Sequence, residues 1–209
     1  RQIGGVAAKL DVLIALGTHQ AMSEEAICGR LEITPEERGS EFANVGFFNH
    51  EWDNPEALRC IGTIGEERIA ELTNGLFSME VPVEINRRVF DYDQVMIIGP
   101  VFPHEVVGFS GGNKYFFPGI GGPQILNFFH WLGAVVTNPE IIGNKWTPVR
   151  QVVDEAGSLI KMDKRCFCLV VDPKKQLRGL YFGSPESAWD AASEQSKQVH
   201  IVYKERKFH

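Results

Sequence analysis

A run of apolar and β-branched residues, Gln94–Gly99, leads into a glycine-rich segment that contains His104 and ends at Lys114. The run is short and almost wholly apolar, which predicts a buried parallel strand. Ligands of open α/β sheets bind in the crevice beyond the carboxyl ends of the strands, so we expect His104 to lie there. Glycines at 108, 111 and 112 allow positive φ angles and let backbone N–H groups point at an anion. The segment is therefore predicted to bind a ligand, with phosphate as the first candidate.

The glycine spacing matches neither of two common nucleotide-binding motifs. A Walker A loop has four residues between its first glycine and Gly-Lys-Ser/Thr, whereas Asn113 precedes Lys114 here and Tyr115 follows it. Gly108–Gly112 and Gly119–Gly122 also lack the spacing of the Gly-x-Gly-x-x-Gly fingerprint. Since a glycine cluster alone is an ordinary loop about as often as a site, it is the flanking histidine and lysine that favour a site.

The order of the predicted elements favours an α/β domain. Strand patterns alternate with helix patterns, which is typical of a three-layer, Rossmann-like domain with a mostly parallel sheet. Two strands, 166–171 and 176–182, flank a turn at Asp172-Pro173 and predict an added β-hairpin. The other expected elements are strands at 11–17, 42–50, 57–63, 81–86 and 199–203, helices that start near Ser23, Thr34 and Ser184, and helices over 124–136 and 148–160.

Length and composition fit a single soluble domain over residues 1–209. The chain is 44% hydrophobic, enough to bury a core, and its formal charge of −6 without a basic stripe argues against nucleic acid or an anionic membrane as a partner. No apolar run approaches the ~18–20 residues that span a bilayer. Cys166 and Cys168 lack CxxC spacing and are expected to be buried thiols. A cytoplasmic location is therefore predicted.

Three segments of the chain resemble the nickel-dependent lactate racemase family. The first is the glycine-rich segment, because Pro103-His104, Gly108-Phe109-Ser110-Gly111-Gly112 and Lys114 occur in the family's order and spacing. The second is Gly17-Thr18-His19, and the third is Asn127–His130, which follows Pro118-Gly119-Ile120. The resemblance extends from about residue 11 to about residue 202 and is dense only around these motifs.

The resemblance implies a racemase or epimerase of a 2-hydroxy acid. In the family, a hydride passes reversibly to a nickel pincer nucleotide, pyridinium-3-thioamide-5-thiocarboxylic acid mononucleotide with Ni, which separate biosynthetic proteins make and load. By this resemblance His19 and His104 form the acid/base pair, and Lys114 is the covalent anchor of the cofactor. Ser110, Gly111 and Gly112 are then expected to shape the loop around the cofactor.

The histidines suit these implied roles to different degrees. An ordinary pKa near ~6.5 lets imidazole take and return a proton at neutral pH. By the resemblance His130 is the nickel ligand, for which imidazole is a suitable donor. From its apolar neighbours alone, His130 reads first as a core histidine held by a hydrogen bond. His50 and His200 match no family motif and are expected to be structural.

Some of the family pattern has no counterpart in this sequence. An acidic, Arg-containing segment near the amino terminus and a second lobe that closes over the site have no counterpart in residues 1–209. Residues 1–209 are therefore expected to correspond to the family's N-terminal, cofactor-binding domain, which we do not expect to turn over alone. The segment 40–79 is longer than expected for the lactate enzyme, which favours a larger 2-hydroxy acid as substrate.

Two other classes of function remain open at this point. One is a zinc hydrolase that uses His19, His104 and His130, although the sequence has no HExxH pair. The other is a non-catalytic module that binds phosphate or a nucleotide on the glycine-rich segment. The sequence does not give the oligomeric state.

Overall fold

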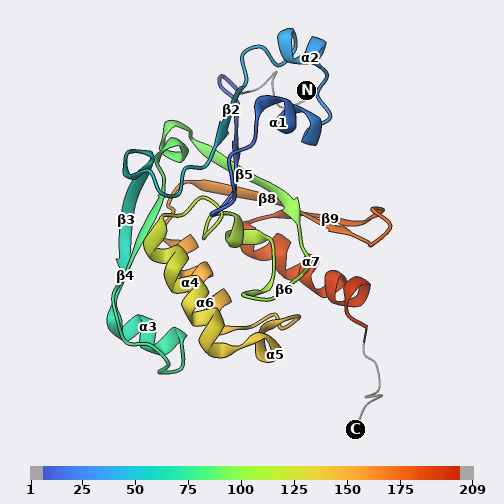
Figure 1. The fold of residues 1–209 in the computed structure, drawn as a ribbon. Coiled ribbons are helices and arrows are strands. Elements are labelled where there is room, and N and C mark those ends of the chain that lie inside the picture. Colours follow the sequence, from blue (N-terminus) through green and yellow to red (C-terminus); the bar gives the residue numbers. More distant parts are fainter. Residues whose placement is uncertain (1–6, 203–209) are drawn as a thin grey trace.

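The computed structural model describes residues 7–202, which form a mixed α/β fold with several small sheets (Figure 1). The strands are β1 (Asp11–Ile14), β2 (Gly46–Asn49), β3 (Leu58–Ile64), β4 (Val81–Asn86), β5 (Gln94–Pro100), β6 (Pro103–His104), β7 (Gly108–Phe109), β8 (Asp163–Val171) and β9 (Leu177–Gly183). The α-helices are α1 (Glu24–Arg30), α2 (Pro35–Gly39), α3 (Glu66–Leu72), α4 (Pro123–Val136), α5 (Asn138–Ile141), α6 (Pro148–Ser158) and α7 (Pro185–His200). Short 3₁₀ helices are η1 (Pro55–Ala57), η2 (Arg87–Asp91) and η3 (Gly112–Tyr115).

The predicted α/β class is confirmed, but the single, mostly parallel sheet is wrong for the described residues. Only β1 with β2 and β5 with β8 pair in parallel. The pairs β3–β4, β6–β7 and β8–β9 are antiparallel, and β8–β9 is the predicted hairpin. For two of these pairs the reason is local: the connections 105–107 of β6–β7 and 172–176 of β8–β9 are short, whereas a parallel pair needs a crossover of a dozen or more residues.

Helix starts follow the capping signals in the sequence. Thr34 and Glu37 form a reciprocal capping box at the start of α2, with Pro35 in its first turn. The hydroxyl of Ser184 accepts a hydrogen bond from the Ser187 N–H and starts α7. These helices therefore begin where the sequence predicted.

The predicted final strand at 199–203 is wrong in its described part. Helix α7 continues to His200, while residue 203 lies outside the described residues. The His200 ring contacts the carbonyl oxygens of Ser196 and Val171 at 3.0 and 2.9 Å. These contacts fix the last turn of α7 against the end of β8, which overrides the β-branched pattern of this segment and agrees with a structural role for His200.

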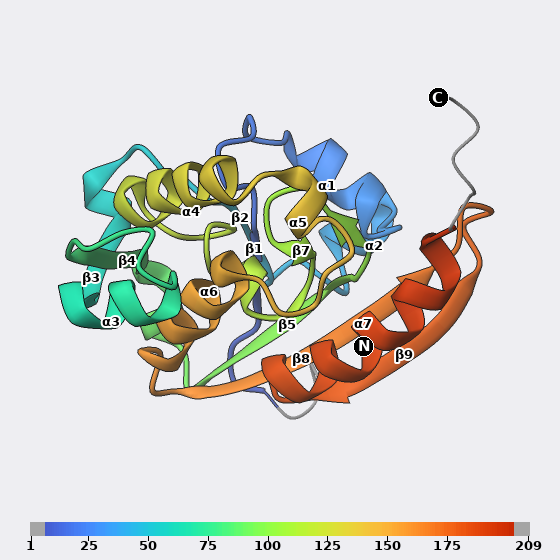
Figure 2. The same cartoon turned by 90° about the horizontal axis from the view of Figure 1, so that it is seen from below.

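A three-stranded sheet, β5-β8-β9, supports the region that contains the glycine-rich segment. Helix α7 lies along β8 and β9 (Figure 2) and covers the face to which β8 presents Cys166, Cys168 and Val170. Both thiols are fully buried, as predicted, with their Sγ atoms 3.3 Å apart. The opposite face leaves Ile98 and Phe182 more than half exposed.

Helix α4 packs against β4 and α6 and buries one face only. Phe128 and Phe129 are in the core, whereas His130 and Trp131 are exposed. Residues 124–136 are apolar almost all round, a pattern typical of a helix buried between layers, but no described element covers the face that carries His130 and Trp131. Within residues 7–202, no helix is both long and apolar enough to cross a membrane.

Candidate active site

The segment from Pro103 to Lys114, here called the lysine loop, folds back on itself beyond the end of β5. Strand β6 pairs with β7, which sets His104 opposite Gly108. The 3₁₀ helix η3 follows immediately and carries Lys114. The loop thus brings the histidine and the lysine to the carboxyl end of β5, as predicted for His104. The predicted parallel pairing of this strand is confirmed, whereas its predicted burial is wrong, since Ile98 is 66% exposed.

The glycines of the lysine loop approach the rest of the protein closely. Gly111 has φ +88°, and a Cβ added there would lie 2.4 Å from the Val101 side chain. Gly112 has φ +58°, and its Cβ would lie 2.9 Å from the Cβ of Trp189. A side chain at either position would be strained and would clash. The glycines therefore let the loop pack closely against α7 and against Val101, the residue after β5. The sequence did not reveal this contact.

Ser110 ties the loop together internally. Its side chain is buried, its hydroxyl donates to the Pro100 carbonyl oxygen at 3.1 Å, and its Oγ accepts from the Phe102 N–H at 3.0 Å. The backbone N–H of Ser110 also donates to the Phe102 carbonyl oxygen at 2.9 Å. The hydroxyl and the N–H of Ser110 thus both stabilise the β5–β7 connection, which makes this residue a support of the loop.

Three consecutive carbonyl oxygens of the loop accept hydrogen bonds from buried side chains of α6 and α7. Arg150 Nη2 donates to the Phe109 oxygen at 2.7 Å and to the Gly111 oxygen at 3.2 Å. Trp189 Nε1 donates to the Ser110 oxygen at 2.9 Å. We call Arg150 and Trp189 the carbonyl clamp. Sequence reasoning missed both residues, because an arginine and a tryptophan far along the chain give no sign of contact with the loop.

A second contact holds the residue before the lysine. The Asn113 side-chain amide donates to Asp154 of α6 at 3.0 Å and to Glu186 of α7 at 2.8 Å. Asn113 is buried beneath the loop, and its Oδ1 has no hydrogen-bond partner among the described residues. Lys114 therefore follows a residue that two helices fix in place.

Lys114 has an amine of unusual acidity. Burial and the positive charge of Arg150 lower its pKa to about 8, against the opposing effect of Glu105. An ordinary lysine has a pKa near ~10.4 and is almost wholly charged at neutral pH. Near pH 8 the Lys114 amine is therefore divided between its charged form and its neutral, nucleophilic form.

His104 is a neutral imidazole at physiological pH. Burial lowers its pKa to about 4, with further lowering by Lys114, Arg150 and His130 and an opposite effect from Glu105. The Val106 N–H donates to His104 Nδ1 at 3.1 Å. Since Nδ1 is the acceptor, the ring proton is on Nε2. These charge effects also place His104 within electrostatic reach of both Lys114 and His130.

His130 is on the exposed face of α4, which excludes the reading as a core histidine. Its Nδ1 lies 2.9 Å from the Leu126 carbonyl oxygen, which only accepts, so Nδ1 carries the proton. The ring packs edge-on against Phe129, with centroids 5.1 Å apart. Within residues 7–202 no hydrogen bond involves Nε2, an arrangement found in metal-binding histidines whose other nitrogen is held by a carbonyl.

His19 lies in the turn after β1 and is exposed. Its turn is joined to the segment after Lys114, because the Gly17 N–H donates to the Gly119 oxygen at 2.8 Å. Among the contacts of the described residues, none joins the His19 side chain directly to His104, Lys114 or His130. The backbone thus connects the two motifs, while the His19 side chain stands apart from the other three.

His50, expected to be structural, is buried and satisfied on both ring nitrogens. Its Nε2 donates to the Gly121 carbonyl oxygen at 3.0 Å, and its Nδ1 accepts from the Asn86 amide at 3.2 Å. Burial lowers the pKa of His50. His50 therefore connects the end of β2 to the start of α4, which carries His130.

The described residues do not gather ligands in the way that a histidine-ligated zinc site requires. Within residues 7–202, no group of three or more His, Cys, Asp and Glu side chains is placed to hold a metal ion. A zinc hydrolase would need His19, His104 and His130 around one ion. The geometry gives no support to that alternative.

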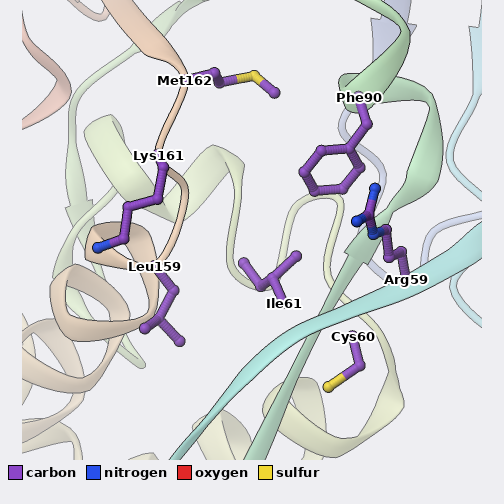
Figure 3. Close-up of a pocket in the computed structure, with 7 residues that line it drawn as sticks. All are labelled: Arg59, Cys60, Ile61, Phe90, Leu159, Lys161 and Met162. Atoms are coloured by element: carbon purple, nitrogen blue, oxygen red, sulfur yellow. The ribbon is translucent and has the colours of Figure 1, made fainter.

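An open hollow of about 390 Å³ lies away from these residues (Figure 3). It is formed by β3, Phe90 and the connection from α6 to β8, where Arg59 stacks on the Phe90 ring at 4.4 Å. Its lining residues are Arg59, Cys60, Ile61, Phe90, Leu159, Lys161 and Met162. None of the predicted site residues contributes to it, so the hollow does not define the candidate active site.

Comparison with known proteins agrees with the resemblance of the motifs. The profile of the lactate racemase N-terminal domain matches residues 1–141. A crystal structure of a protein from Thermotoga maritima has a TM-score of 0.86 and 33% identity over 98% of this chain and 50% of that chain. The lactate racemase apoprotein from Thermoanaerobacterium thermosaccharolyticum has a TM-score of 0.71 and 22% identity over 92% and 42%, a likeness of fold.

No curated protein matched the sequence. The chain spans half or less of the length of the two solved structures. The profile match covers most of the chain, and the Thermotoga maritima protein is 33% identical over nearly all of it. The chain therefore belongs to the lactate racemase N-terminal domain family.

Proposed function

We propose that this chain is the cofactor-binding part of a racemase or epimerase that acts on a 2-hydroxy acid. The observation that carries the proposal is the state of Lys114, whose pKa is lowered to about 8 beside a neutral His104. In the family, the lysine at this position of the motif anchors the nickel pincer nucleotide covalently. An anchoring amine has to be neutral to react, and a pKa of about 8 gives Lys114 a far larger neutral fraction near neutral pH than an ordinary lysine has.

The residues around Lys114 fit such a cofactor. His130 offers a free Nε2 on an exposed helix face, and imidazole is a suitable ligand for Ni²⁺. The lysine loop is held rigidly by α6 and α7, which suits a site that must orient a bound group. When bound, the cofactor would supply a hydride acceptor, so that the α-hydrogen leaves without forming a carbanion.

His104 would exchange a proton with the hydroxyl group of the substrate. With Nδ1 occupied by the Val106 N–H, its Nε2–H is set to donate a hydrogen bond or a proton. To take a proton at Nε2, the ring has to change tautomer and place a proton on Nδ1, which lies 3.6 Å from the Glu105 carboxylate. Glu105 would then stabilise the protonated ring, because a nearby carboxylate favours the charged imidazole.

His19 would be the second proton-transferring group, acting on the opposite face of the substrate. Its turn is bonded through Gly17 to Gly119, which places it beside the segment that follows Lys114. The substrate is proposed to be lactate or a larger 2-hydroxy acid. The long segment that suggested a larger acid forms β2, β3 and α3, and α3 packs on α6.

The anchoring role is tested by intact-protein mass spectrometry with peptide mapping, on protein produced together with the pincer-synthesis enzymes. We expect a cofactor adduct on Lys114 together with bound nickel. The Lys114→Met variant is expected to lose the adduct, whereas Lys174→Met, which alters an exposed lysine of the β8–β9 hairpin, is expected to keep it. If Lys114 is unmodified and the protein copurifies with a nucleotide, the proposal is overturned in favour of a non-catalytic nucleotide-binding module.

The acid/base roles are tested on the cofactor-loaded protein by chiral chromatography of 2-hydroxy acids. His19→Ala and His104→Ala are each expected to abolish racemisation and to retain the Lys114 adduct. Gln20→Ala, which alters an exposed neighbour of His19, provides the matched control and is expected to retain activity. Full activity in either histidine variant would remove that residue from the proposed mechanism.

A further inference from the structure

The carbonyl clamp makes Arg150 the buried centre of the lysine loop. Arg150 is fully buried on α6, yet its Nη2 reaches the carbonyl oxygens of Phe109 and Gly111 at 2.7 and 3.2 Å. Its guanidinium lies 3.9 Å from the ring centroid of Trp189, which donates to the oxygen between those two. Two stacked side chains, Arg150 and Trp189, therefore fix the backbone that leads to Lys114.

The positive charge of Arg150 is only partly compensated. The carboxylate of Asp154, one turn along α6, lies 3.5 Å from Nη1. Among the described residues, neither Nε nor Nη1 of Arg150 has a hydrogen-bond acceptor. The part of the Arg150 charge that Asp154 does not offset is felt by neighbouring groups, because burial reduces screening by water. This charge acts on the groups just above the loop.

The charged groups that face Lys114 come from few elements. Arg150 of α6 disfavours the charged amine, while Glu105 of the lysine loop favours it. Glu105 is exposed, so water screens its effect more strongly than that of the buried arginine. His104, which also faces Lys114, is neutral over the range in which the amine titrates. The balance of charges therefore favours the neutral amine.

We propose that Arg150 is a positioning residue for cofactor attachment: it fixes the loop that carries Lys114, and its buried charge favours the neutral form of the Lys114 amine. This inference rests on the proposed function and adds a residue that makes the Lys114 amine ready to react with the cofactor. It also explains why a large cation is retained in the core beneath the loop, where burial without full pairing is costly.

The test is competitive labelling of the apoprotein with acetic anhydride between pH 7 and 11, with peptide mass spectrometry of each lysine. Exposed lysines such as Lys174 serve as references in the same sample. Arg150→Gln removes the charge and retains a donor for a loop carbonyl. We expect the midpoint of Lys114 labelling to rise by roughly one pH unit, a tenfold loss of neutral amine at a fixed pH below the midpoint.

A second variant is expected to shift the midpoint of Lys114 labelling in the opposite direction. Asp154→Asn removes the carboxylate that partly neutralises Arg150, while its side-chain oxygen can still accept from Asn113. The midpoint of Lys114 labelling is therefore expected to fall. Mere loosening of the loop would expose the amine and raise the midpoint in both variants. Shifts in the same direction, or no shift in either variant, would overturn the inference.

The control is Arg68→Gln, which removes an exposed arginine of α3. Its partner Glu155 lies on α6, the helix that carries Arg150. The labelling midpoint of this variant is expected to equal that of the unaltered protein, and a rise equal to that of Arg150→Gln would overturn the specific role of Arg150. Circular dichroism checks that each variant is folded. If Arg150→Gln does not fold, Asp154→Asn decides alone, since a fall supports the inference and an unchanged midpoint contradicts it.

This experiment separates the inference from the proposed function. Labelling needs no cofactor, so a missing adduct on Lys114 after production with the synthesis enzymes would remove the proposed function and leave the labelling result intact. An adduct on Lys114 together with an unchanged midpoint in both variants would overturn the role of Arg150 alone.

Discussion

Gly17 donates its backbone N–H to the carbonyl oxygen of Gly119 at 2.8 Å. The Gly119 N–H in turn donates to the carbonyl oxygen of Lys114 at 3.2 Å. Two backbone hydrogen bonds thus connect the turn of His19 to the residue that we propose as the cofactor anchor. Motifs that are distant in the sequence are joined by the main chain, so their relative position does not depend on long side chains.

The charge of Lys114 should affect His104 directly. Lys114 is the second cause, after burial, of the low pKa of His104. Lys114→Met removes that charge, so the pKa of His104 is expected to rise from about 4 toward its ordinary value. NMR titration of the histidine ring protons measures it. Lys145→Met, which removes an amine paired with Asp190 and Glu194, should leave His104 unchanged.

This prediction has a functional consequence. Covalent attachment of the cofactor would convert the Lys114 amine to an uncharged group. It would therefore raise the pKa of His104, as Lys114→Met is expected to do. We expect His104 to titrate closer to neutral pH in the loaded protein, where an acid/base group is most effective. A His104 pKa that does not move in Lys114→Met would show that burial alone sets it.

Ser110 should matter for stability. Ser110→Ala removes the buried hydroxyl that bonds Pro100 and Phe102, so the Phe102 N–H loses its acceptor and the Pro100 carbonyl oxygen loses one donor. The expected loss in the free energy of unfolding is about 1–2 kcal/mol. Urea denaturation measures it. Ser158→Ala, at an exposed serine that bonds the Glu155 carbonyl, should cost less than about 0.5 kcal/mol. Equal losses would contradict the supporting role.

His130 should contribute little to stability and much to metal binding. Because the side chain is exposed, His130→Ala is expected to change the free energy of unfolding by less than about 0.5 kcal/mol. In the cofactor-loaded protein the same variant is expected to lose nickel, as measured by inductively coupled plasma mass spectrometry. Gln124→Ala, at another exposed position of α4, is the matched control. Full nickel retention in His130→Ala would exclude it as the ligand.

Acidification should destabilise the fold before the carboxylates titrate. Burial lowers the pKa of both His50 and His104, with His104 at about 4. Such groups bind a proton more readily in the unfolded chain, so stability is fully present above the unfolded pKa of ~6.5 and falls as the pH drops from there to the folded pKa. We expect a loss of about 1–3 kcal/mol between pH 6.5 and 4.

Denaturant titrations at a series of pH values measure this slope. His50→Gln and His104→Gln should each flatten it, because the substituted amide does not titrate in this range. A slope that is unchanged in both variants would mean that other groups cause the acid sensitivity. The His50 variant also loses contacts to Gly121 and Asn86, so its stability at neutral pH is expected to be lower.

Local signals in the sequence predicted local structure well. Residues 81–86 are β4, as predicted, and the predicted run Gln94–Gly99 is β5 with one further residue. The capping box at Thr34 also marks the start of α2. Each of these features depends on a few adjacent residues, whose apolar pattern or hydrogen bonds are readable from the sequence alone. The helix α3 was not predicted, since its pattern is short and only Ile69 and Leu72 are buried.

The amino-acid sequence by itself determined most of the longer strands and helices, the residues of the lysine loop and the family. Only the tertiary structure decided which strands pair, that α7 extends through His200, and that Arg150 and Trp189 hold the loop. Strand pairing and burial depend on contacts between residues far apart in the chain, and an arginine is ordinarily found at the surface. The environment that lowers the pKa of Lys114 is built from such contacts, so it exists only in the folded protein.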